Sequence, residues 1–302
     1  MTLEQLRIFV AVAEREHVTN AARALNLTQS AASAAIAALE AAHDTRLFDR
    51  VGRGIELTAA GRLFLAEARA VLARADAAEL ALSELGGLKR GTLVVQASQT
   101  VASYWLPRHL VAFRRAHPGV AVRLGIGNTT QVAAAVGDGT AELGFVESAI
   151  ENPALACEAV ARDQLLLVVA PDHPWAARGR LAPGNLAQGE WVLREPGSGT
   201  RSEFEAAVER LGLSPRALNV VLELPANEAV RAAVEAGMGA TAISASVAAP
   251  SLEAGLLKHV RLDLPDRSFR VLYHRERRRS RAAERVHGII AGTAPRKWIR
   301  KG

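Results

Sequence analysis

The sequence has few of the features that mark secreted or membrane proteins. Its single cysteine, Cys157, excludes a disulfide bond within the chain, and we interpret it as a small buried apolar residue. No run approaches the about 18 consecutive apolar residues that a membrane-spanning helix needs. Residues 1–4 precede an amphipathic helix and lack the basic start and apolar run of a signal peptide. These absences predict a cytoplasmic protein with no membrane partner.

Signatures of enzymes are also missing. The sequence has no His-Glu-x-x-His zinc motif, no Gly-x-Ser-x-Gly nucleophile elbow and no pair of cysteines. Its eight histidines are scattered, and no loop ends in the Gly-Lys-Ser/Thr of a nucleotide-binding P-loop. We therefore expect no catalytic residue, no metal site and no cofactor.

The formal net charge of +6 is unevenly distributed along the 302 residues. Residues 1–65 contain seven arginines and seven acidic residues, whereas residues 267–302 contain twelve basic and two acidic residues. An argument for nucleic-acid binding must therefore rest on individual arginines rather than on overall charge. We favour a solubilising role for the basic C-terminal tail, and a second contact with DNA is the alternative.

Residues 18–40 predict two short helices joined by a tight turn. Thr19 and Thr28 are suited to cap them, since a threonine hydroxyl accepts a hydrogen bond from a free backbone N–H. Apolar residues repeat at helical spacing in the second helix and should point inward. They are Ala32, Ile36 and Leu39.

Polar side chains then occupy the outer N-terminal end of the second helix. In a helix-turn-helix this end meets base edges in the major groove, where Gln pairs with adenine and Ser serves donor or acceptor edges. We therefore predict DNA contacts by Thr28, Gln29, Ser30 and Ser33. The alternative is an alanine-rich helical hairpin from an unrelated bundle.

A glycine-rich turn at residues 50–54 carries Arg50 and Arg53 between apolar ends. A β-hairpin tip of this kind can place both arginines on phosphates or in the minor groove. Such contacts set the register of the protein on DNA rather than its sequence preference.

A long helix is expected from Thr58 to about residue 85. Its apolar residues alternate in steps of four and three, which predicts pairing with a second helix. The alternative is an amphipathic helix packed on its own domain. The residues concerned are Phe64, Ala68, Val71, Ala75, Ala78, Leu82 and Leu85.

Beyond the glycines of residues 86–91, short apolar strands alternate with helices. This alternation predicts βαβ units and a parallel sheet covered on both faces. Two such sets occur, and the chain crosses between them near residues 161–163 and 264–266. The predicted fold class is thus α + α/β, with a winged helix-turn-helix at 1–58, a linker helix at 59–88 and a two-lobed α/β domain at 91–302. Lobe I comprises residues 91–161 and 267–302, and lobe II comprises residues 162–266.

Several motifs together resemble the DNA-binding domain of the LysR-type transcriptional regulators. In chain order they are the Leu-x-x-Phe helix from Leu6, the Ala pair at 21–22, Gln-x-x-x-Ser from Gln29, Leu-Glu at 39–40, Leu-Phe-x-Arg from Leu47 and Leu-Thr-x-x-Gly from Leu57. The resemblance implies a type 2 periplasmic-binding-protein-like effector domain and a homodimer or homotetramer that binds promoter half-sites in duplex DNA. RNA polymerase is an open candidate partner.

A loop at residues 197–201 is the best candidate for the effector. It follows a strand and opens a helix, and its two glycines bring backbone N–H groups to a helix N-terminus that favours anions. Ser198 and Thr200 add hydroxyl donors, and Arg201 adds a cation. We therefore predict a small anionic effector, either a carboxylate or an inorganic oxyanion. The alternative is a plain helix-entry loop with Arg201 in a structural ion pair.

Loops after other strands complete the predicted effector site. Glu147 works against a bare dianion unless a cation, such as Arg201, pairs with it. The predicted site consists of Ser98, Thr100, Thr129, Glu147, Ser198, Thr200, Arg201 and Asn227. Within the family, the chain resembles most the branch that senses sulfur oxyanions or related small anions.

The sequence thus predicts a ligand-responsive transcriptional regulator. The rival is an α/β solute-binding or enzymatic protein with an accessory helical domain. A solute-binding protein would need a signal peptide, and an enzyme would need a convergent acid, base or nucleophile. A non-specific architectural DNA-binding protein is disfavoured, because such binding is mostly electrostatic and residues 1–65 are neutral.

Overall fold

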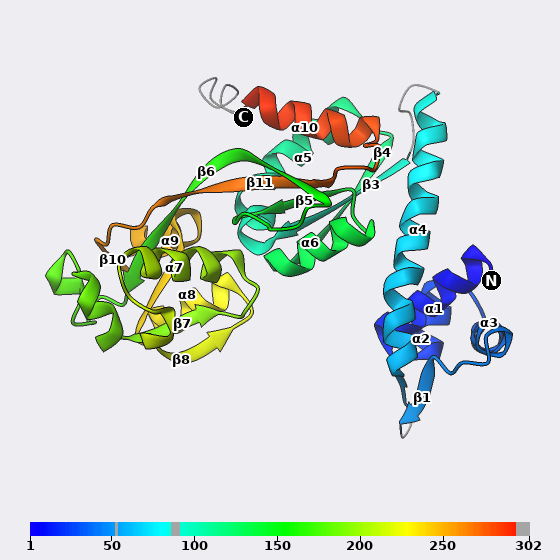
Figure 1. Cartoon of the computed structure of the whole chain (residues 1–302), viewed down its shortest axis with the longest axis horizontal. Helices are drawn as coiled ribbons and strands as arrows, with labels where there is room; N and C mark the ends of the chain where they lie inside the picture. Colours follow the sequence, from blue (N-terminus) through cyan, green and yellow to red (C-terminus); the bar gives the residue numbers. More distant parts are fainter. Residues whose placement is uncertain (52–53, 86–90, 294–302) are drawn as a thin grey trace. The chain divides into compact units, whose positions relative to one another are not determined.

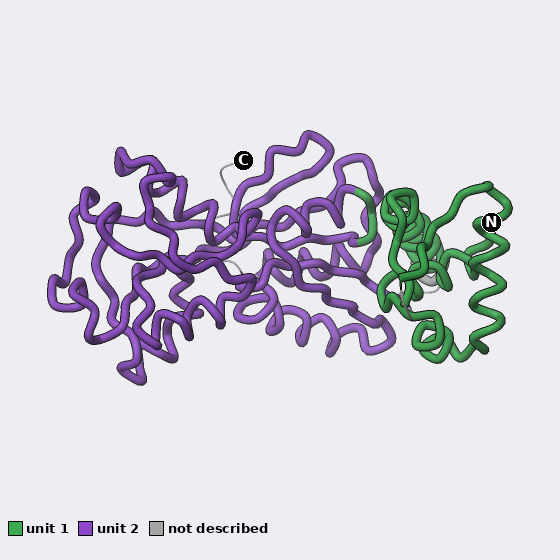
Figure 2. Tube along the Cα trace, turned by 90° about the horizontal axis from the view of Figure 1, so that it is seen from below, with its two compact units in different colours: residues 1–85, 138–140 green, residues 86–137, 141–302 purple. Residues whose placement is uncertain are grey.

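The computed structural model describes residues 1–51, 54–85 and 91–293 (Figure 1). The chain forms two compact units, coloured separately in Figure 2. Unit 1 comprises residues 1–85 and 138–140, and unit 2 comprises residues 86–137 and 141–302. No helix within the described ranges is long and apolar enough to cross a membrane.

Unit 1 has the helix–helix–helix–hairpin–helix order of a winged helix-turn-helix. Strands β1 and β2 pair in antiparallel fashion and form the wing. The elements are α1 (Leu3–Arg15), α2 (Val18–Ala24), α3 (Gln29–Ala42), β1 (Phe48–Val51), β2 (Gly54–Leu57) and α4 (Ala59–Leu85).

Side-chain caps set where these helices begin. At α3 the Thr28 hydroxyl accepts a hydrogen bond from the Ala31 N–H, as predicted. At α2 the capping group is instead the ring of His17, whose Nδ1 accepts from the Asn20 N–H, so Thr19 is not the cap. Between the two helices, Asn26 takes a left-handed conformation with φ of 56°, which asparagine tolerates better than most residues.

Small and aromatic residues share the core of unit 1. Ala22 and Ala32 are buried, which lets α2 and α3 approach closely. The Phe9 ring of α1 lies 5.4 Å from the Phe48 ring of the wing and 4.9 Å from the Phe64 ring of α4. Each pair is tilted, a favourable geometry for aromatic rings. The core therefore joins the helix-turn-helix, the wing and the first turns of α4.

The apolar residues of α4 that repeat in steps of four and three lie in two different environments. Its first residues, Phe64 and Ala68, pack into the core of unit 1. Farther along, Val71 and Leu82 are 40% and 71% exposed. The start of α4 therefore packs on its own domain, as the alternative interpretation predicted. The exposed residues farther along are available to a second helix. The predicted end of the linker at residue 88 lies outside the described residues.

The described part of unit 2 contains a nine-stranded sheet in the order β4-β3-β5-β11-β6-β9-β7-β8, with β10 paired to β6. The sheet is mixed: β3 is parallel to β4 and β5, whereas β11 is antiparallel to both β5 and β6. The strands are β3 (Gly91–Ser98), β4 (Val120–Gly127), β5 (Leu143–Val146), β6 (Leu155–Val169), β7 (Glu190–Arg194), β8 (Asn219–Leu224), β9 (Ala240–Ser244), β10 (Lys258–Val260) and β11 (Asp266–His274).

The long strand β6 connects the two lobes. Its first part pairs with β11, and its last five residues pair with β9. Only residues 165–169 of this strand form a long unbroken apolar run, because the preceding residues are more polar. Cys157 lies in this strand and is half-buried against the lobe I core, rather than fully buried as expected.

Helices cover the lobe I sheet from both sides. Helix α5 connects β3 to β4 and α6 connects β4 back to β5, so right-handed crossovers put them on opposite faces. In Figure 1, α10 lies beside α5. The helical segments of unit 2 are η1 (Val101–Trp105), α5 (Leu106–Ala116), α6 (Thr129–Asp138), η2 (Ala176–Arg178), η3 (Pro183–Gln188), α7 (Gly199–Arg210), η4 (Pro215–Ala217), α8 (Asn227–Glu235), α9 (Ala245–Glu253) and α10 (Arg281–Thr293).

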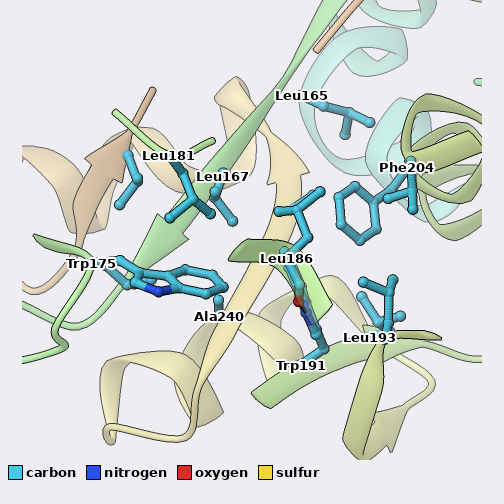
Figure 3. Packing of buried hydrophobic residues seen from close by; sticks show 14 residues of the cluster. Leu165, Leu167, Trp175, Leu181, Leu186, Trp191, Leu193, Phe204 and Ala240 are labelled. Atoms are coloured by element: carbon cyan, nitrogen blue, oxygen red, sulfur yellow. Dashed lines mark hydrogen bonds between the residues drawn. The ribbon is translucent and has the colours of Figure 1, made fainter. Parts of the chain in front are cut away.

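Three aromatic rings pack among leucines, valines and alanines in one hydrophobic cluster of lobe II (Figure 3). The Trp191 ring on β7 lies 4.8 Å from the Phe204 ring on α7 and 5.8 Å from the Trp175 ring. The buried Trp191 Nε1 donates to the Leu186 carbonyl over 2.8 Å, which satisfies its one polar atom. This packing holds β7 and α7 together and so positions the loop between them.

Candidate DNA-binding surface and interlobe site

The N-terminal end of α3 presents polar side chains to solvent. Thr28, Gln29, Ser30 and Ser33 are all exposed, and the Thr28 and Ser30 hydroxyl oxygens are 3.0 Å apart. The residues predicted to point inward, Ala32, Ile36 and Leu39, are buried. The four predicted DNA contacts therefore share one accessible end of a helix whose other face is fixed in the core.

The wing is attached to α3 by a side chain that sequence reasoning did not single out. Glu40, near the end of α3, accepts hydrogen bonds from the Leu47 and Phe48 N–H groups over 2.7 and 3.2 Å. In the hairpin Arg50 is exposed and stands opposite Ile55, while Arg53 lies outside the described residues. Glu40 thus positions the wing relative to α3. The only sequence signal was its place in the Leu-Glu motif.

The Leu-Thr-x-x-Gly motif has a direct physical reason. The Thr58 hydroxyl donates to the Arg46 carbonyl and accepts from the Gly61 N–H, so it joins the wing to the start of α4. A β-carbon on Gly61 would lie only 2.1 Å from the Leu47 carbonyl oxygen. Only glycine fits at this contact between helix and backbone.

The second candidate site lies where lobes I and II face each other, at the N-terminus of α7. A β-carbon on Gly199 would lie 2.5 Å from Thr129 Oγ1, 2.9 Å from Glu147 Oε2 and 3.2 Å from Ser148 Oγ. The Ser198 side chain makes no capping hydrogen bond to the helix. The first N–H groups of α7 therefore face lobe I side chains without a hydroxyl cap of their own.

Seven of the eight predicted effector residues are buried in this region. Asn227 Nδ2 donates to Thr100 Oγ1 over 3.0 Å, which joins the two lobes directly. Ser98 ends β3 beside the end of β5, next to Glu147. The seven residues are Ser98, Thr100, Thr129, Glu147, Ser198, Thr200 and Asn227, each no more than 6% exposed.

Arg201 has a different environment. Its Nε donates to Glu205 over 2.7 Å, and its Nη1 contacts Glu223 and donates to the Arg194 carbonyl over 3.0 Å. Both carboxylates belong to lobe II, so the charge of Arg201 is compensated within that lobe. The structure therefore places Arg201 in the structural ion pair that the sequence left as the alternative.

Arg267 is the arginine that sequence reasoning missed. This β11 residue is buried, and its Nη1 donates to Thr200 Oγ1 over 3.1 Å. Its Nε donates to Asp163 Oδ2 over 2.6 Å, opposite it in the pairing of β11 with β6. In the sequence Arg267 counted only as one of many C-terminal basic residues, and no local signal distinguishes it.

Four buried polar atoms of this region make no hydrogen bond within the described part of the chain. They are Ser98 Oγ, Thr129 Oγ1, Glu147 Oε2 and Arg267 Nη2, and the last lies 2.6 Å from Asp163 Oδ2 without hydrogen-bond alignment. An unpaired buried polar atom costs about 1–3 kcal/mol, so native proteins rarely leave one. Several in one place indicate a site that a ligand completes.

A buried polar network links the two lobes. Arg194 donates to both carboxylate oxygens of Glu195 and, through Nη1, to Asn227 Oδ1 over 2.7 Å. Glu195 accepts from Asn128 of lobe I, and the Asn227 N–H donates to Gln99 of lobe I. We call these five residues, with Thr100, the interlobe network. Arg194 is at the centre of the network because it binds both Glu195 and Asn227. Its own hydrogen bonds in the network are all to residues of lobe II.

Carboxylates are numerous around the interlobe site. Burial raises the pKa of Glu203 on α7, the charges of Arg267, Arg210 and Arg270 oppose that rise, and the charge of Glu147 adds to it. Within the described residues, no group of three or more His, Cys, Asp or Glu side chains could hold a metal ion.

Comparison with known proteins places both units in one family. The family described as "LysR substrate binding domain" matches residues 86–294, and "Bacterial regulatory helix-turn-helix protein, lysR family" matches residues 3–62. The uncharacterized HTH-type transcriptional regulator YeiE of Escherichia coli (strain K12) is 35% identical over 289 residues, which cover 94% of this chain and 95% of that protein. The HTH-type transcriptional regulator Rv2282c of Mycobacterium tuberculosis (strain ATCC 25618 / H37Rv) is 40% identical over 270 residues, covering 87% and 86%.

Solved structures share the fold over the whole chain. The full-length regulator CbnR in complex with its target DNA matches with a TM-score of 0.70 at 24% identity, covering 97% of this chain and 100% of that chain. A hydrogen peroxide-bound cysteine-to-serine mutant of OxyR from Corynebacterium glutamicum matches with a TM-score of 0.61 at 25% identity, covering 96% and 92%.

Proposed function

Because the chain belongs to the LysR family of bacterial transcriptional regulators, we propose that a small effector, bound between its two lobes, controls how it binds promoter DNA. The four unpaired buried atoms of the interlobe site are the observation that carries this proposal. By function, residues 1–58 bind DNA, residues 59–88 pair two chains and residues 91–302 bind the effector. A protein that regulates bacterial promoters acts in the cytoplasm, where the DNA lies.

Sequence preference would come from the exposed end of α3. Gln29 and Ser33 read base edges in the major groove, with Thr28 and Ser30 beside them. Arg50 and Arg53 of the wing bind phosphates or the minor groove and set the register. Glu40 supports this division, because it ties the wing to α3 and so presents both contacts as one rigid surface.

Pairing of two chains would involve α4. Val71 and Leu82 are large apolar side chains exposed on this helix, and burying them against a second α4 removes apolar surface from water. A two-fold dimer then presents two copies of α3 to two half-sites on DNA. Pairing of effector domains extends the dimer to a tetramer that contacts separated half-sites.

An acid group of the effector would bind at the N-terminus of α7. The uncapped N–H groups and the helix dipole favour negative charge there. Ser98 and Thr129 supply unpaired hydroxyls from lobe I, and Arg267 supplies a partly unpaired guanidinium. Glu147 lies in the same site. The effector must therefore also provide a partner for the Glu147 carboxylate, which a bare dianion does not.

Control of DNA binding follows from the position of the site between lobes. The interlobe network holds the lobes in one arrangement, and an effector that contacts both lobes adds binding energy to whichever arrangement fits it better. Such a ligand shifts the population of arrangements by its difference in affinity for them. In a dimer or tetramer, that shift changes the relative placement of the α3 helices.

Two measurements test this function together. Genome-wide mapping of DNA bound by the full chain identifies its promoters, and fluorescence anisotropy on one promoter measures affinity with and without small acids. We expect at least one acid to change the Kd or the footprint. The double variant Ser98→Val with Thr129→Val should lose that response while keeping basal DNA binding. A response of the double variant equal to that of the wild type would place the effector elsewhere. Absence of any specific footprint would contradict the proposal that the chain regulates specific promoters.

A further inference from the structure

Glu147 is the unusual residue of the interlobe site. Its side chain is only 2% exposed, and Oε2 has no hydrogen-bond partner within the described part of the chain. A buried carboxylate without a donor or a cation is strongly unfavourable, and such charges are normally paired. The side chain therefore needs a partner that this chain does not itself provide at Oε2.

Three arginines near the site already have carboxylate partners. Arg194 is bound through two nitrogens to Glu195, and Arg267 is paired with Asp163. Arg201, the cation expected to neutralise Glu147, is paired with Glu205 and Glu223 instead. None of these three arginines is therefore left to neutralise Glu147.

Glu203 is a second acidic side chain near Glu147, and the charges of Arg267, Arg210 and Arg270 also act on it. It lies close enough to Glu147 for that charge to add to the rise of its pKa, behind the larger effect of burial. The charge of Glu147 itself makes a bare sulfate or phosphate unfavourable, because like charges repel across a buried region of low dielectric.

Hydrogen-bond donors lie next to Glu147. The N-terminus of α7 begins at Gly199, whose backbone adjoins both Glu147 Oε2 and Thr129 Oγ1. The Ser98 hydroxyl, which makes no hydrogen bond within the described residues, and the Arg267 guanidinium, which is paired with Asp163, are suited to bind an acid group as well. One site thus presents hydrogen-bond donors for an anion and, beside them, an unpaired carboxylate for a cation.

We infer that the effector carries both an acid group and a protonated amine, as a free amino acid does, and that Glu147 binds the ammonium and selects for it. This inference rests on the proposed function and narrows its ligand class. The acid group occupies the α7 N-terminus, and three ammonium N–H donors are available to the Glu147 carboxylate. Such a ligand binds the α7 N-terminus through its acid group and pairs the buried charge of Glu147 through its ammonium.

Thermal unfolding of the full chain tests this inference. The probes are the twenty standard amino acids, the 2-hydroxy acids lactate, glycerate and malate, which replace the amine of alanine, serine and aspartate by a hydroxyl, and sodium sulfate. We expect at least one amino acid to raise the Tm of the wild type, and each hydroxy acid to bind at least ten-fold more weakly than its amino acid. Sulfate should have no specific effect on the wild type.

The variant Glu147→Gln provides the decisive comparison. It should weaken amino acid binding at least ten-fold and allow sulfate to raise the Tm, because the repelling charge is gone. The control Glu253→Gln makes the same change at an exposed position of α9 and should behave as the wild type. Far-UV circular dichroism of both variants checks that each is folded.

Three results would overturn the inference. Sulfate that stabilises the wild type as well as Glu147→Gln would show a site for anions alone. Binding of a hydroxy acid as tight as that of its amino acid would show that the amine is not recognised, and failure of every amino acid to bind would have the same meaning. In each case the proposed function survives. A Tm shift that persists unchanged in both Glu147→Gln and Thr129→Val would instead place the ligand outside the interlobe site and contradict the proposed function too.

Discussion

Arg194 donates a hydrogen bond from Nη1 to Oδ1 of Asn227 over 2.7 Å, deep inside unit 2. The same guanidinium binds both oxygens of Glu195, and each of these two partners also bonds to lobe I. A single side chain of lobe II therefore holds in place two of the groups that join it to lobe I. The contact between lobes depends on a residue that only positions others.

Replacing Arg194 should weaken the contact between lobes strongly. In Arg194→Met the partly buried Glu195 carboxylate, 24% exposed, loses its bidentate partner, and the cost should lie below the range of about 3–5 kcal/mol that breaking a fully buried pair costs. The measurement is chemical unfolding of the full chain. The control Arg180→Met removes an ion pair with Asp263 that is largely exposed, and such pairs contribute about 0–1 kcal/mol. Equal effects of the two changes would contradict the central role of Arg194.

Adding one methyl group at Gly61 should destabilise unit 1. The β-carbon of Gly61→Ala would meet the Leu47 carbonyl at 2.1 Å, and backbone atoms cannot move aside as a flexible side chain can. Overpacking of this kind costs about 1–3 kcal/mol or more. The control Gly288→Ala in α10 meets nothing within 4 Å and should stabilise by up to about 1 kcal/mol through helix propensity. Urea unfolding of both variants would show the opposite signs, and a neutral Gly61→Ala would refute the close contact.

Changes on α3 and on the wing should affect DNA binding in different ways. Gln29→Ala with Ser33→Ala should remove the preference for the mapped promoter over unrelated DNA and leave the oligomeric state unchanged, since both side chains are exposed. Arg50→Ala should weaken binding to all sequences alike and lower the slope of log affinity against log salt by about 1. Salt-dependent anisotropy on specific and unrelated duplexes measures both. Retained promoter preference in the α3 double variant would disprove the assignment of the recognition helix.

The pH dependence of stability should contain a contribution from His109. Burial, helped by the charge of Arg108, lowers the pKa of this α5 side chain from 6.5 to about 4. The unfolded chain therefore binds the proton more readily than the folded chain. The contribution of His109 to the free energy of unfolding is thus complete above pH 6.5 and falls as the pH decreases toward 4. The expected slope is at most about 1.4 kcal/mol per pH unit for one group. Unfolding midpoints at about pH 5 and about pH 7.5, on either side of the ordinary histidine pKa, should differ less in His109→Leu than in the wild type. An identical difference would show that His109 does not titrate in this range.

Local sequence was sufficient to predict unit 1. Thr28 caps α3, and Ala32, Ile36 and Leu39 turn inward as their spacing predicted, so the polar end of that helix had to face outward. Caps and helical periodicity act over a few residues, and their physical causes can therefore be read from neighbouring positions. The glycine of the Leu-Thr-x-x-Gly motif was recognised as part of a pattern, but its reason, the Leu47 carbonyl, became clear only from the structure.

Tertiary structure alone determined which charges meet between the lobes. Arg201 and Arg267 carry the same side chain, and the sequence does not show which acidic residue each one binds. Arg201 pairs with Glu205, four residues away, whereas Arg267 pairs with Asp163, 104 residues away. The second pairing depends on the register of β11 against β6, two strands joined by the whole of lobe II. Chain segments so distant have no local signature of their contact, because electrostatic partners are selected by packing and burial rather than by spacing. The sequence by itself therefore determined which elements form and which loops end beside one another, and the packed lobes determined that Glu147 lacks a cation.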